Sequence, residues 1–348
     1  MREIVRFSAV NAKIDKMYSD LLKDTDYIKL AHMDNVGEIS KYLMENSQIG
    51  KDFERAYDRT YEAELCMQRY KIKQLKKLTH YLTDDYKVFV NALLYEFEIS
   101  DIKKVLRILQ RNEKIDEKDL SSKLLIMNKD PHFKLDSDMD IPTFINSLKN
   151  TRYYRVLQSY QDEEKDVILF YMEMNLDKLY YSTLVNAAKG FSTTDKECVK
   201  QILGRKIDLL NIEWIYRGMK YYKLLPEELI NFCILGGCKF KYDNLKDFCY
   251  LETLDDFVEA IKKTDYKFLF FGTKTDIYLD RRSSRYLYYI AKKEFVKSTF
   301  SVGKLISYAV LLRSEVKDIS AIMETTRFNI SFEETLKYLV RSYKGSEI

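Results

Sequence analysis

The sequence predicts an all-α protein made of three similar helical bundles. Glycine and proline number only 10 and 3 among 348 residues, which leaves few residues suited to tight turns and bulges. No segment alternates apolar and polar residues for long enough to indicate a β-strand. A helical motif also occurs three times along the chain, and each copy is long enough to form a small bundle of its own.

The repeated motif is best defined in residues 203–229, where apolar and aromatic side chains recur every three to four positions, as on one face of a helix. Its copies begin with an acidic residue, at Glu98, Asp208 and Glu315. Three positions later comes an acid or its amide, at Asp101, Asn211 and Asp318, and an isoleucine follows directly each time. Two copies add an arginine, Arg107 and Arg217, where the third has Glu324.

A second motif repeats with nearly the same period. Residues 141–154 and 251–269 share a phenylalanine, an apolar residue, a threonine and a tyrosine at equal spacings. The corresponding residues are Phe144, Leu148, Thr151 and Tyr153 in one copy, and Phe257, Ile261, Thr264 and Tyr266 in the other. The segment 36–48 keeps only Ile39 and Leu43. Two motifs with one period favour triplication of an ancestral bundle.

The repeated acids have two explanations. Residues three apart share a helix face, so Glu98 with Asp101, and Glu315 with Asp318, could line a common polar surface. Alternatively, each acid hydrogen-bonds a neighbouring helix within its own bundle. The structural explanation needs fewer assumptions, because every copy must close its bundle in the same way.

The same patterns place the individual helices along the chain. A first helix is expected within 1–30 with Ser8 near its N-terminal cap, and Asp24 to Asp26 interrupt the pattern. The central helix runs from about 203 to Pro226, and a further helix starts there. The other expected helices are 36–46, 51–81, 86–111, 142–158, 162–190, 194–203, 254–263, 277–296, 299–326 and 331–343.

Two stretches are candidate domain boundaries. Residues 112–140 are the most polar part of the chain and contain Pro131. Gly236 and Gly237 form the only Gly-Gly pair, after Leu235. We therefore expect three helical repeats, at 1–118, 119–235 and 236–348.

Composition excludes several functions. The 58 basic and 54 acidic residues nearly balance, which does not indicate nucleic-acid binding. No Gly-x-x-x-x-Gly-Lys loop is present, so direct nucleotide binding by a P-loop is not expected. The three histidines, His32, His80 and His132, are far apart, and the five cysteines form no metal or disulfide framework. The sequence predicts no catalytic residues, no cofactor and no metal site.

Residues 280–293 interleave arginines and lysines with tyrosines. This pattern fits a solvated helix face with extended basic side chains, an RNA surface, or a patch for anionic lipid or an acidic protein. Elsewhere, no apolar run approaches the roughly 20 residues of a spanning helix, and no apolar signal segment opens the chain. The expectation is a cytosolic protein that could sit on a membrane complex.

The chain resembles the C subunit of the bacterial and archaeal V/A-type ATPases, which is similar to the d subunit of the eukaryotic vacuolar enzyme. The resemblance covers nearly the whole chain. It rests on the segments 7–22, 96–107, 206–229 and 311–322, together with the length and the three copies.

This resemblance implies a helical funnel with approximate internal threefold symmetry, acting as a non-catalytic rotor part of the central stalk. Such a rotor part caps the membrane ring of proteolipid subunits and receives the shaft, which the D and F subunits form. It serves ATP-driven ion transport or ion-driven ATP synthesis as a peripheral protein on the cytoplasmic face of the membrane, and needs no cofactor.

Two other classes of protein remain possible from the sequence: a helical scaffold unrelated to the ATPase, and a metal-dependent helical hydrolase. For the first hypothesis, the repeated polar positions are the candidate residues of the shaft or ring interface. They are Glu98, Asp101, Arg107, Asp208, Asn211, Arg217, Glu315 and Asp318.

Overall fold

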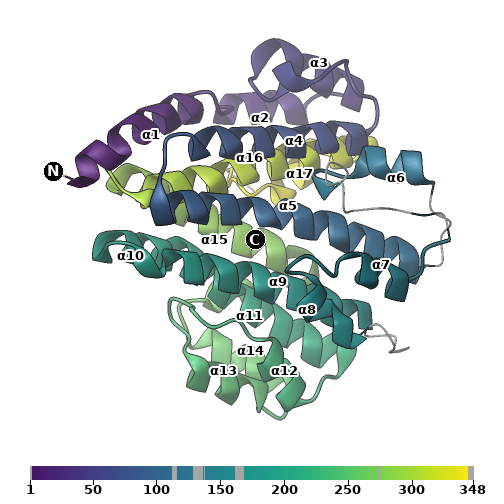
Figure 1. Ribbon diagram of the computed structural model, residues 1–348. Helices are drawn as coiled ribbons and strands as arrows, with labels where there is room; N and C mark the ends of the chain where they lie inside the picture. Colours follow the sequence, from purple (N-terminus) through teal and green to yellow (C-terminus); the bar gives the residue numbers. More distant parts are fainter. Residues whose placement is uncertain are drawn as a thin grey trace.

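The computed structural model describes residues 2–111, 116–127, 136, 138–160, 168–272 and 275–343. Every regular element in these residues is helical, which confirms the predicted all-α class. Figure 1 shows the helices along the chain. They are α1 (Arg2–Ser19), α2 (Asp24–Ala31), α3 (Val36–Asn46), α4 (Thr60–Thr79), α5 (Asp84–Gln110), α6 (Glu117–Lys123), α7 (Ile141–Ser147), α8 (Tyr154–Leu157), α9 (Ile168–Ala187), α10 (Thr193–Val199), α11 (Arg205–Arg217), α12 (Pro226–Phe232), α13 (Tyr242–Cys249), α14 (Leu254–Lys262), α15 (Thr275–Lys297), α16 (Val302–Arg327) and α17 (Phe332–Tyr338).

Three long helical hairpins form the framework. They are α4 with α5, α9 with α10 and α11, and α15 with α16, and the second helix of each carries one copy of the first motif. The residues that precede these second helices are Thr83, Ser192 and Ser301, at equal intervals of 109. Ser192 and Ser301 accept hydrogen bonds from backbone N–H groups of the first helical turn, which stabilises the helix start.

The buried carboxylate of Asp195 joins the N-terminal ends of the second helices of the three hairpins. It accepts a 2.6 Å hydrogen bond from the hydroxyl of Tyr86, at the start of α5. Its other oxygen accepts a 2.9 Å bond from the N–H of Val302, the first residue of α16. Tyr86 and Asp195 occupy the same position in their copies, three residues after Thr83 and Ser192.

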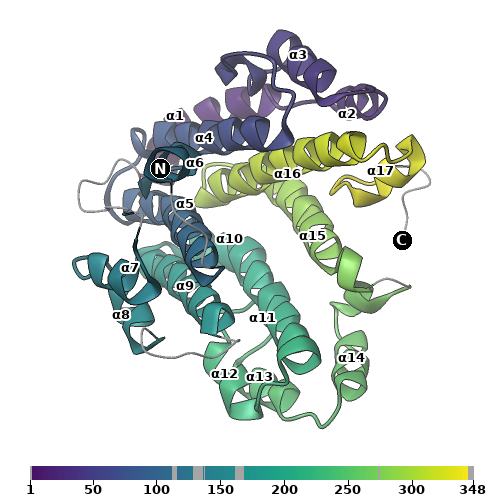
Figure 2. The same cartoon turned by 90° about the vertical axis from the view of Figure 1, so that its right-hand side faces the viewer.

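Smaller helices cover the outside of the hairpins. Helices α13 and α14 pack on α11, and α7 packs on α5. Helices α2 and α3 pack on α16, although they lie at the opposite end of the sequence. Figure 2 shows α5, α9, α11, α15 and α16 around a common centre. The boundaries between the predicted repeats stay predictions, at 1–118, 119–235 and 236–348. Helices α2 and α3, from the first of these ranges, pack on α16, from the third.

The core takes its residues from the repeated motif. The motif isoleucines Ile102, Ile212 and Ile319 are all buried. The β-branched residues three positions further, Val105, Ile215 and Ile322, are buried as well. Burial of six such side chains at one repeated pair of positions explains why these positions stay apolar in every copy.

Several predicted helix limits are wrong. Helix α1 begins at Arg2, so Ser8 lies inside it and donates to the carbonyl of Ile4 instead of capping the helix start. Helix α2 starts at Asp24, where an interruption was predicted, because the carboxylate of Asp26 accepts the N–H of Lys23 and caps the helix. Helices α6 and α13 lie in stretches where no helix was predicted.

The helix predicted over 142–158 is two helices, α7 and α8, separated by a turn. In this turn the Thr151 hydroxyl donates to the carbonyl of Leu148 and accepts the N–H of Tyr153. Thr264 makes the same two bonds, to Ile261 and Tyr266, in the other copy. The repeated threonine therefore ends the helix and sets the position of the repeated tyrosine.

No helix in the described part of the chain is long and apolar enough to cross a membrane.

Candidate functional site

The second polar position of the motif ties each long helix to a loop that follows it in the sequence. The buried carboxylate of Asp101 accepts the N–H groups of residues 125–127 at 2.8 to 3.0 Å. The buried amide of Asn211 exchanges two 2.8 Å bonds with the backbone of Ile234. Asp318 accepts the N–H of Val340 at 2.6 Å and pairs with Arg341. In all three copies, the motif side chain thus provides hydrogen-bond partners for backbone groups of a loop that has no neighbouring strand or helix to bind.

The acid at the first polar position of the helical motif binds the tyrosine of the second motif. The hydroxyl of Tyr266 donates to Asp208 at 2.6 Å, and the hydroxyl of Tyr153 donates to Glu98. Each repeated tyrosine therefore binds the motif acid that precedes it. In the third copy Glu315 instead accepts the N–H of Leu22 at 2.8 Å, from the loop before α2.

Burial and these hydrogen bonds act in opposite directions on the pKa values of the motif acids. Burial raises the pKa of Asp208 and Asp101, although hydrogen bonds from the neighbouring backbone, and from Tyr266 to Asp208, lower it again. Burial raises the pKa of Glu315 to about 7, with the N–H of Leu22 acting in the opposite direction. The acids are therefore parts of internal hydrogen-bond networks in each bundle.

The two arginines of the candidate interface are more exposed than the repeated acids. Arg107 forms a bidentate ion pair with Glu173, at 2.6 and 2.8 Å, and 54% of its side chain is exposed. Arg217 pairs with Glu213 at 2.9 Å and is 45% exposed. Both arginines remain accessible to a partner, whereas Asp101, Asp208, Asn211, Glu315 and Asp318 are buried.

A cavity lies where the three hairpins meet, and the sequence had not singled out the residues that surround it. Five positions before the acid of each motif stand Leu93, Leu203 and Val310, and all three line this cavity of about 90 Å³. Equivalent residues of all three copies thus surround one space. Their common spacing from the motif acid was visible in the sequence, but leucine and valine at this spacing also fit an ordinary core.

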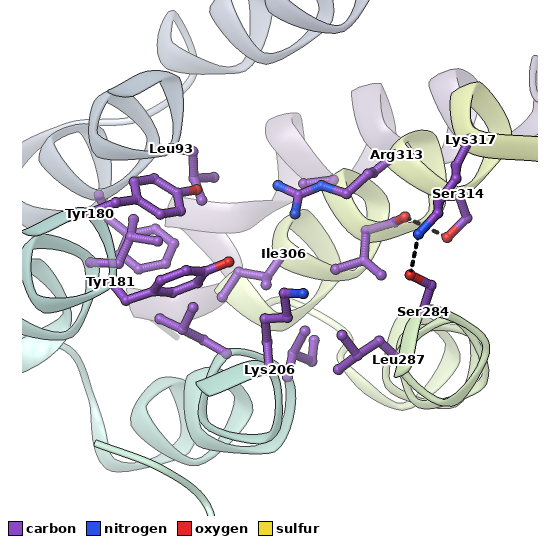
Figure 3. Close-up of a pocket in the computed structure, with 16 residues that line it drawn as sticks. Leu93, Tyr180, Tyr181, Lys206, Ser284, Leu287, Ile306, Arg313, Ser314 and Lys317 are labelled. Atoms are coloured by element: carbon purple, nitrogen blue, oxygen red, sulfur yellow. Dashed lines mark hydrogen bonds between the residues drawn. The ribbon is translucent and has the colours of Figure 1, made fainter. Parts of the chain in front are cut away.

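Of the charged residues two positions before each acid, two line this cavity and the third forms an ion pair with one of them. These equivalent residues are Glu96, Lys206 and Arg313. Arg313 and Glu96 form an ion pair that joins α16 to α5. Lys206 and Arg313 line the cavity together with the hydroxyl-bearing side chains of Tyr180 and Tyr181, as Figure 3 shows.

A π-helical turn places Lys206 at this position. The motif acid follows the residue before the helix by 15 positions in the first copy, Thr83 to Glu98, by 16 in the second, Ser192 to Asp208, and by 14 in the third, Ser301 to Glu315. The π-helical turn Lys200–Gly204 accommodates an extra residue between α10 and α11, because a π-turn holds one more residue than an α-turn.

A larger cavity, of about 490 Å³, shares Arg313 and Lys317 with the first one. It is also lined by Lys71 and Lys104, which come from α4 and α5. Burial lowers the pKa of Lys71 to about 8 and also lowers the pKa of Lys206, where Asp280 and Glu213 raise it in part. Basic side chains nevertheless outnumber acidic ones along the walls of the two cavities.

Several arginines of the basic stretch 280–293 bind inside the fold, which none of the three interpretations of this stretch predicted. Arg281 and Arg282 are buried, and Arg282 donates to the carbonyl of Leu269 at 2.8 Å. Arg285 donates to the carbonyls of residues 339–341. These arginines hold the chain segments beside α15, so they do not form a free basic face.

Among the described residues, no group of three or more histidines, cysteines, aspartates and glutamates is arranged to hold a metal ion. The groups that the cavities present are chiefly amines, a guanidinium, hydroxyls and apolar side chains. Such a lining can bind an anionic or amphipathic group by charge and by apolar contact.

The fold and the cavity define an all-α protein with an internally repeated sequence, in which equivalent residues of the repeats surround one space. The model of the family described as ATP synthase (C/AC39) subunit matches residues 10–338. The chain belongs to this family of ATP synthase subunits, and therefore to the proteins of ATP synthesis and the ion transport coupled to it.

Curated relatives are named as the C subunit of A-type ATP synthases. The chain is similar to that of Methanosphaera stadtmanae, with 22% identity over 94% of this chain and 86% of the relative. It is also similar to those of Methanosarcina barkeri, with 24% identity over 92% and 89%, and Methanosarcina mazei, with 25% identity over 73% and 69%. The family resemblance drawn from the sequence is thereby confirmed.

Proposed function

We propose that this chain is a non-catalytic subunit of the central stalk of an A/V-type ATP synthase, where it joins the D–F shaft to the proteolipid ring. Family membership supports a role within the synthase. The observation that carries the finer role is the meeting of Leu93, Leu203 and Val310, one from each copy, around a single cavity. A socket built from three similar walls suits a part that connects a round ring to a shaft.

The proposed architecture is a funnel with approximate threefold symmetry. Each of the ranges 1–118, 119–235 and 236–348 supplies one hairpin to the wall, namely α4 with α5, α9 with α11, and α15 with α16. The equal spacing of Thr83, Ser192 and Ser301 supports this arrangement. So does the repeated use of the motif residue at Asp101, Asn211 and Asp318 to bind a following loop.

A coupling protein must transmit torque without bending, and the hairpins are joined in a way that favours stiffness. Lys103 pairs with Asp177 at 2.6 Å and Arg107 pairs with Glu173, so α5 and α9 are joined twice. Asp195 connects the N-terminal ends of α5, α10 and α16, one helix from each hairpin. The buried contacts of Asp195 in particular resist relative sliding of the helices, because a displacement would leave its carboxylate unpaired.

Among the eight candidate interface residues, Arg107 and Arg217 are the ones we propose to contact the shaft or the ring directly, because about half of each side chain is exposed. Glu98, Asp101, Asp208, Asn211, Glu315 and Asp318 would shape the interface from within. The protein would lie peripherally at the cytoplasmic face of the membrane and bind neither nucleotide nor nucleic acid itself.

Binding to isolated partners tests the proposal. The full chain is mixed with the D–F shaft of the same source and, separately, with the detergent-solubilised ring, and complexes are detected by size-exclusion chromatography. We expect a stoichiometric complex with each partner and a ternary complex with both. Failure to bind either partner, with the chain folded, would overturn the proposal.

A further inference from the structure

Basic side chains outnumber acidic ones on the walls of the two central cavities. Among the described residues that line the two central cavities, five are basic and two are acidic. The basic ones are Lys71, Lys104, Lys206, Arg313 and Lys317, and the acidic ones are Glu64 and Glu96. An excess of one sign in a partly enclosed space favours a partner of the opposite sign, because low-dielectric walls strengthen its field.

Among the three equivalent charged positions, Glu96, Lys206 and Arg313, the charge of Lys206 is the one left without an ion pair in the described residues. The charge of Arg313 is neutralised by Glu96, its equivalent in the first copy. The ammonium of Lys206 has no hydrogen bond and no ion pair within the described part of the chain. The acids that raise its pKa, Asp280 and Glu213, are paired with Lys317 and Arg217 respectively. Asp177, which also interacts with Lys206, is paired with Lys103.

The side chain of Lys206 extends into the cavity toward the hydroxyl of Tyr181, from the wall opposite Leu93 and Tyr180 (Figure 3). A space of about 90 Å³ has room for the end of one side chain, and too little for a helix. The apolar ring of Leu93, Leu203 and Val310 offers contact to the carbon atoms of that side chain. A carboxylate fits this combination of one free ammonium, tyrosine hydroxyls and an apolar collar.

We propose that the cavity seats a carboxylate carried at the tip of an acidic protein partner, and that Lys206 is its counter-ion. The inference rests on the proposed function, in which that partner is the D–F shaft. Because Arg313 is already paired with Glu96, and Glu96 itself does not line the smaller cavity, Lys206 is the one of the three equivalent charged positions that offers the carboxylate a free cation. A nearly threefold socket thereby accepts its partner in one rotational orientation.

The test compares variants of Lys206 in the full chain for affinity toward the purified shaft at several salt concentrations. Lys206→Glu should weaken binding by at least about tenfold and Lys206→Gln by less, since a buried charge pair is lost or reversed. The salt dependence of the affinity should also fall. Lys206→Arg should retain most of the affinity. Lys293→Glu is the matched control, because Lys293 is exposed on α15 and lines neither cavity.

A second readout does not depend on the stability of the variants. Lysine amines of the wild-type chain are labelled by reductive ¹³C-methylation, and the resonance of Lys206 is assigned by its absence in Lys206→Arg. Burial lowers the pKa of Lys206 in the free chain, so its titration should move to higher pH when the shaft docks. An unchanged titration in the complex would overturn the proposal.

The outcomes separate this inference from the function beneath it. If the wild-type chain does not bind the shaft, the proposed function fails and the inference fails with it. If it binds and all Lys206 variants bind equally well, the inference alone fails. If Lys206→Glu instead abolishes self-association of the chain in sedimentation velocity, the occupant is a second copy, and the acidic shaft tip is ruled out.

Discussion

The hydroxyl of Tyr266 donates a 2.6 Å hydrogen bond to the carboxylate of Asp208, across 58 residues of sequence. The carboxylate also accepts the N–H of Lys239 at 2.7 Å, so helix α11, the loop after α12 and the turn after α14 meet at one side chain. Tyr153 and Glu98 repeat the contact in the first copy. The two sequence motifs are therefore the two halves of one interaction.

Removal of the tyrosine hydroxyl should measure the strength of this interaction. Tyr266→Phe leaves Asp208 buried with one donor fewer and should lower the free energy of unfolding by about 1–2 kcal/mol. Tyr153→Phe should have a similar effect. Chemical denaturation followed by circular dichroism measures both. The control is Tyr250→Phe, whose hydroxyl binds Glu227 at the surface, and it should change stability by less than about 0.5 kcal/mol.

Asp195 should be among the most sensitive polar residues of the chain. Asp195→Ala leaves the hydroxyl of Tyr86 and the N–H of Val302 without their buried acceptor, which should cost about 3 kcal/mol. Asp195→Asn keeps one acceptor oxygen and should cost less. Hydrogen exchange of the Val302 amide provides the local measurement. Exchange as slow as in the wild type would show that Asp195 does not hold the start of α16.

Glu315 should give the protein a characteristic pH dependence. Its folded-state pKa of about 7 lies above the ordinary value of 4.5, mainly because of burial, while Arg341 opposes the shift and Asp318 and Asp26 add to it. Between these two pH values the folded state binds the proton and the unfolded state does not. The free energy of unfolding should therefore decrease as pH rises from 4.5 to 7, by on the order of 3 kcal/mol from this residue.

Glu315→Gln separates this effect from other titrations. Glutamine cannot ionise, so the melting temperature of the variant should depend less on pH than that of the wild type over the same range. Differential scanning calorimetry at several pH values tests the difference. Parallel pH profiles of the two proteins would contradict the assignment to Glu315.

Arg107 offers a test of the candidate interface outside the cavity. Arg107→Glu should weaken binding to the shaft or the ring, and added salt should reduce the difference from the wild type, because exposed charges are screened. Binding is measured by biolayer interferometry at low and moderate salt. Arg55→Glu is the control, since Arg55 is likewise exposed and paired, with Glu62. Equal affinities of wild type and Arg107→Glu would assign Arg107 to the fold alone.

The repeated polar residues mark the limit of what helical periodicity can predict. A spacing of three puts Glu98 and Asp101 on one helix face, but both an open surface and a buried contact satisfy it. In α11 even Asp208, Asn211 and Glu213 are buried, so polarity did not mark the solvent side. The loop that each second polar residue binds lies more than 20 positions away, beyond the reach of helical periodicity.

The arginines of α15 also show that helical spacing does not tell a buried polar residue from an exposed one. Their spacing among tyrosines fits a solvated basic face, yet Arg282 and Arg285 donate to backbone carbonyls at Leu269 and in residues 339–341. The carbonyls of residues 339–341 reach α15 only in the folded chain, whereas Leu269 lies in the turn just before it. The need to satisfy them, which local sequence does not reveal, turns the guanidinium groups inward.

By itself the sequence determined that the chain is helical, that one helical motif occurs three times, and which family it resembles, because helical periodicity and copied motifs are local properties. Only the tertiary structure decided that α2 and α3 pack on α16, that most of the motif's polar residues are buried, and that Arg313 lines a cavity with Lys206 while it pairs with Glu96. The first and last of these relationships join residues more than a hundred positions apart. They follow from how three helical hairpins pack against one another, which depends on complementary surfaces in three dimensions.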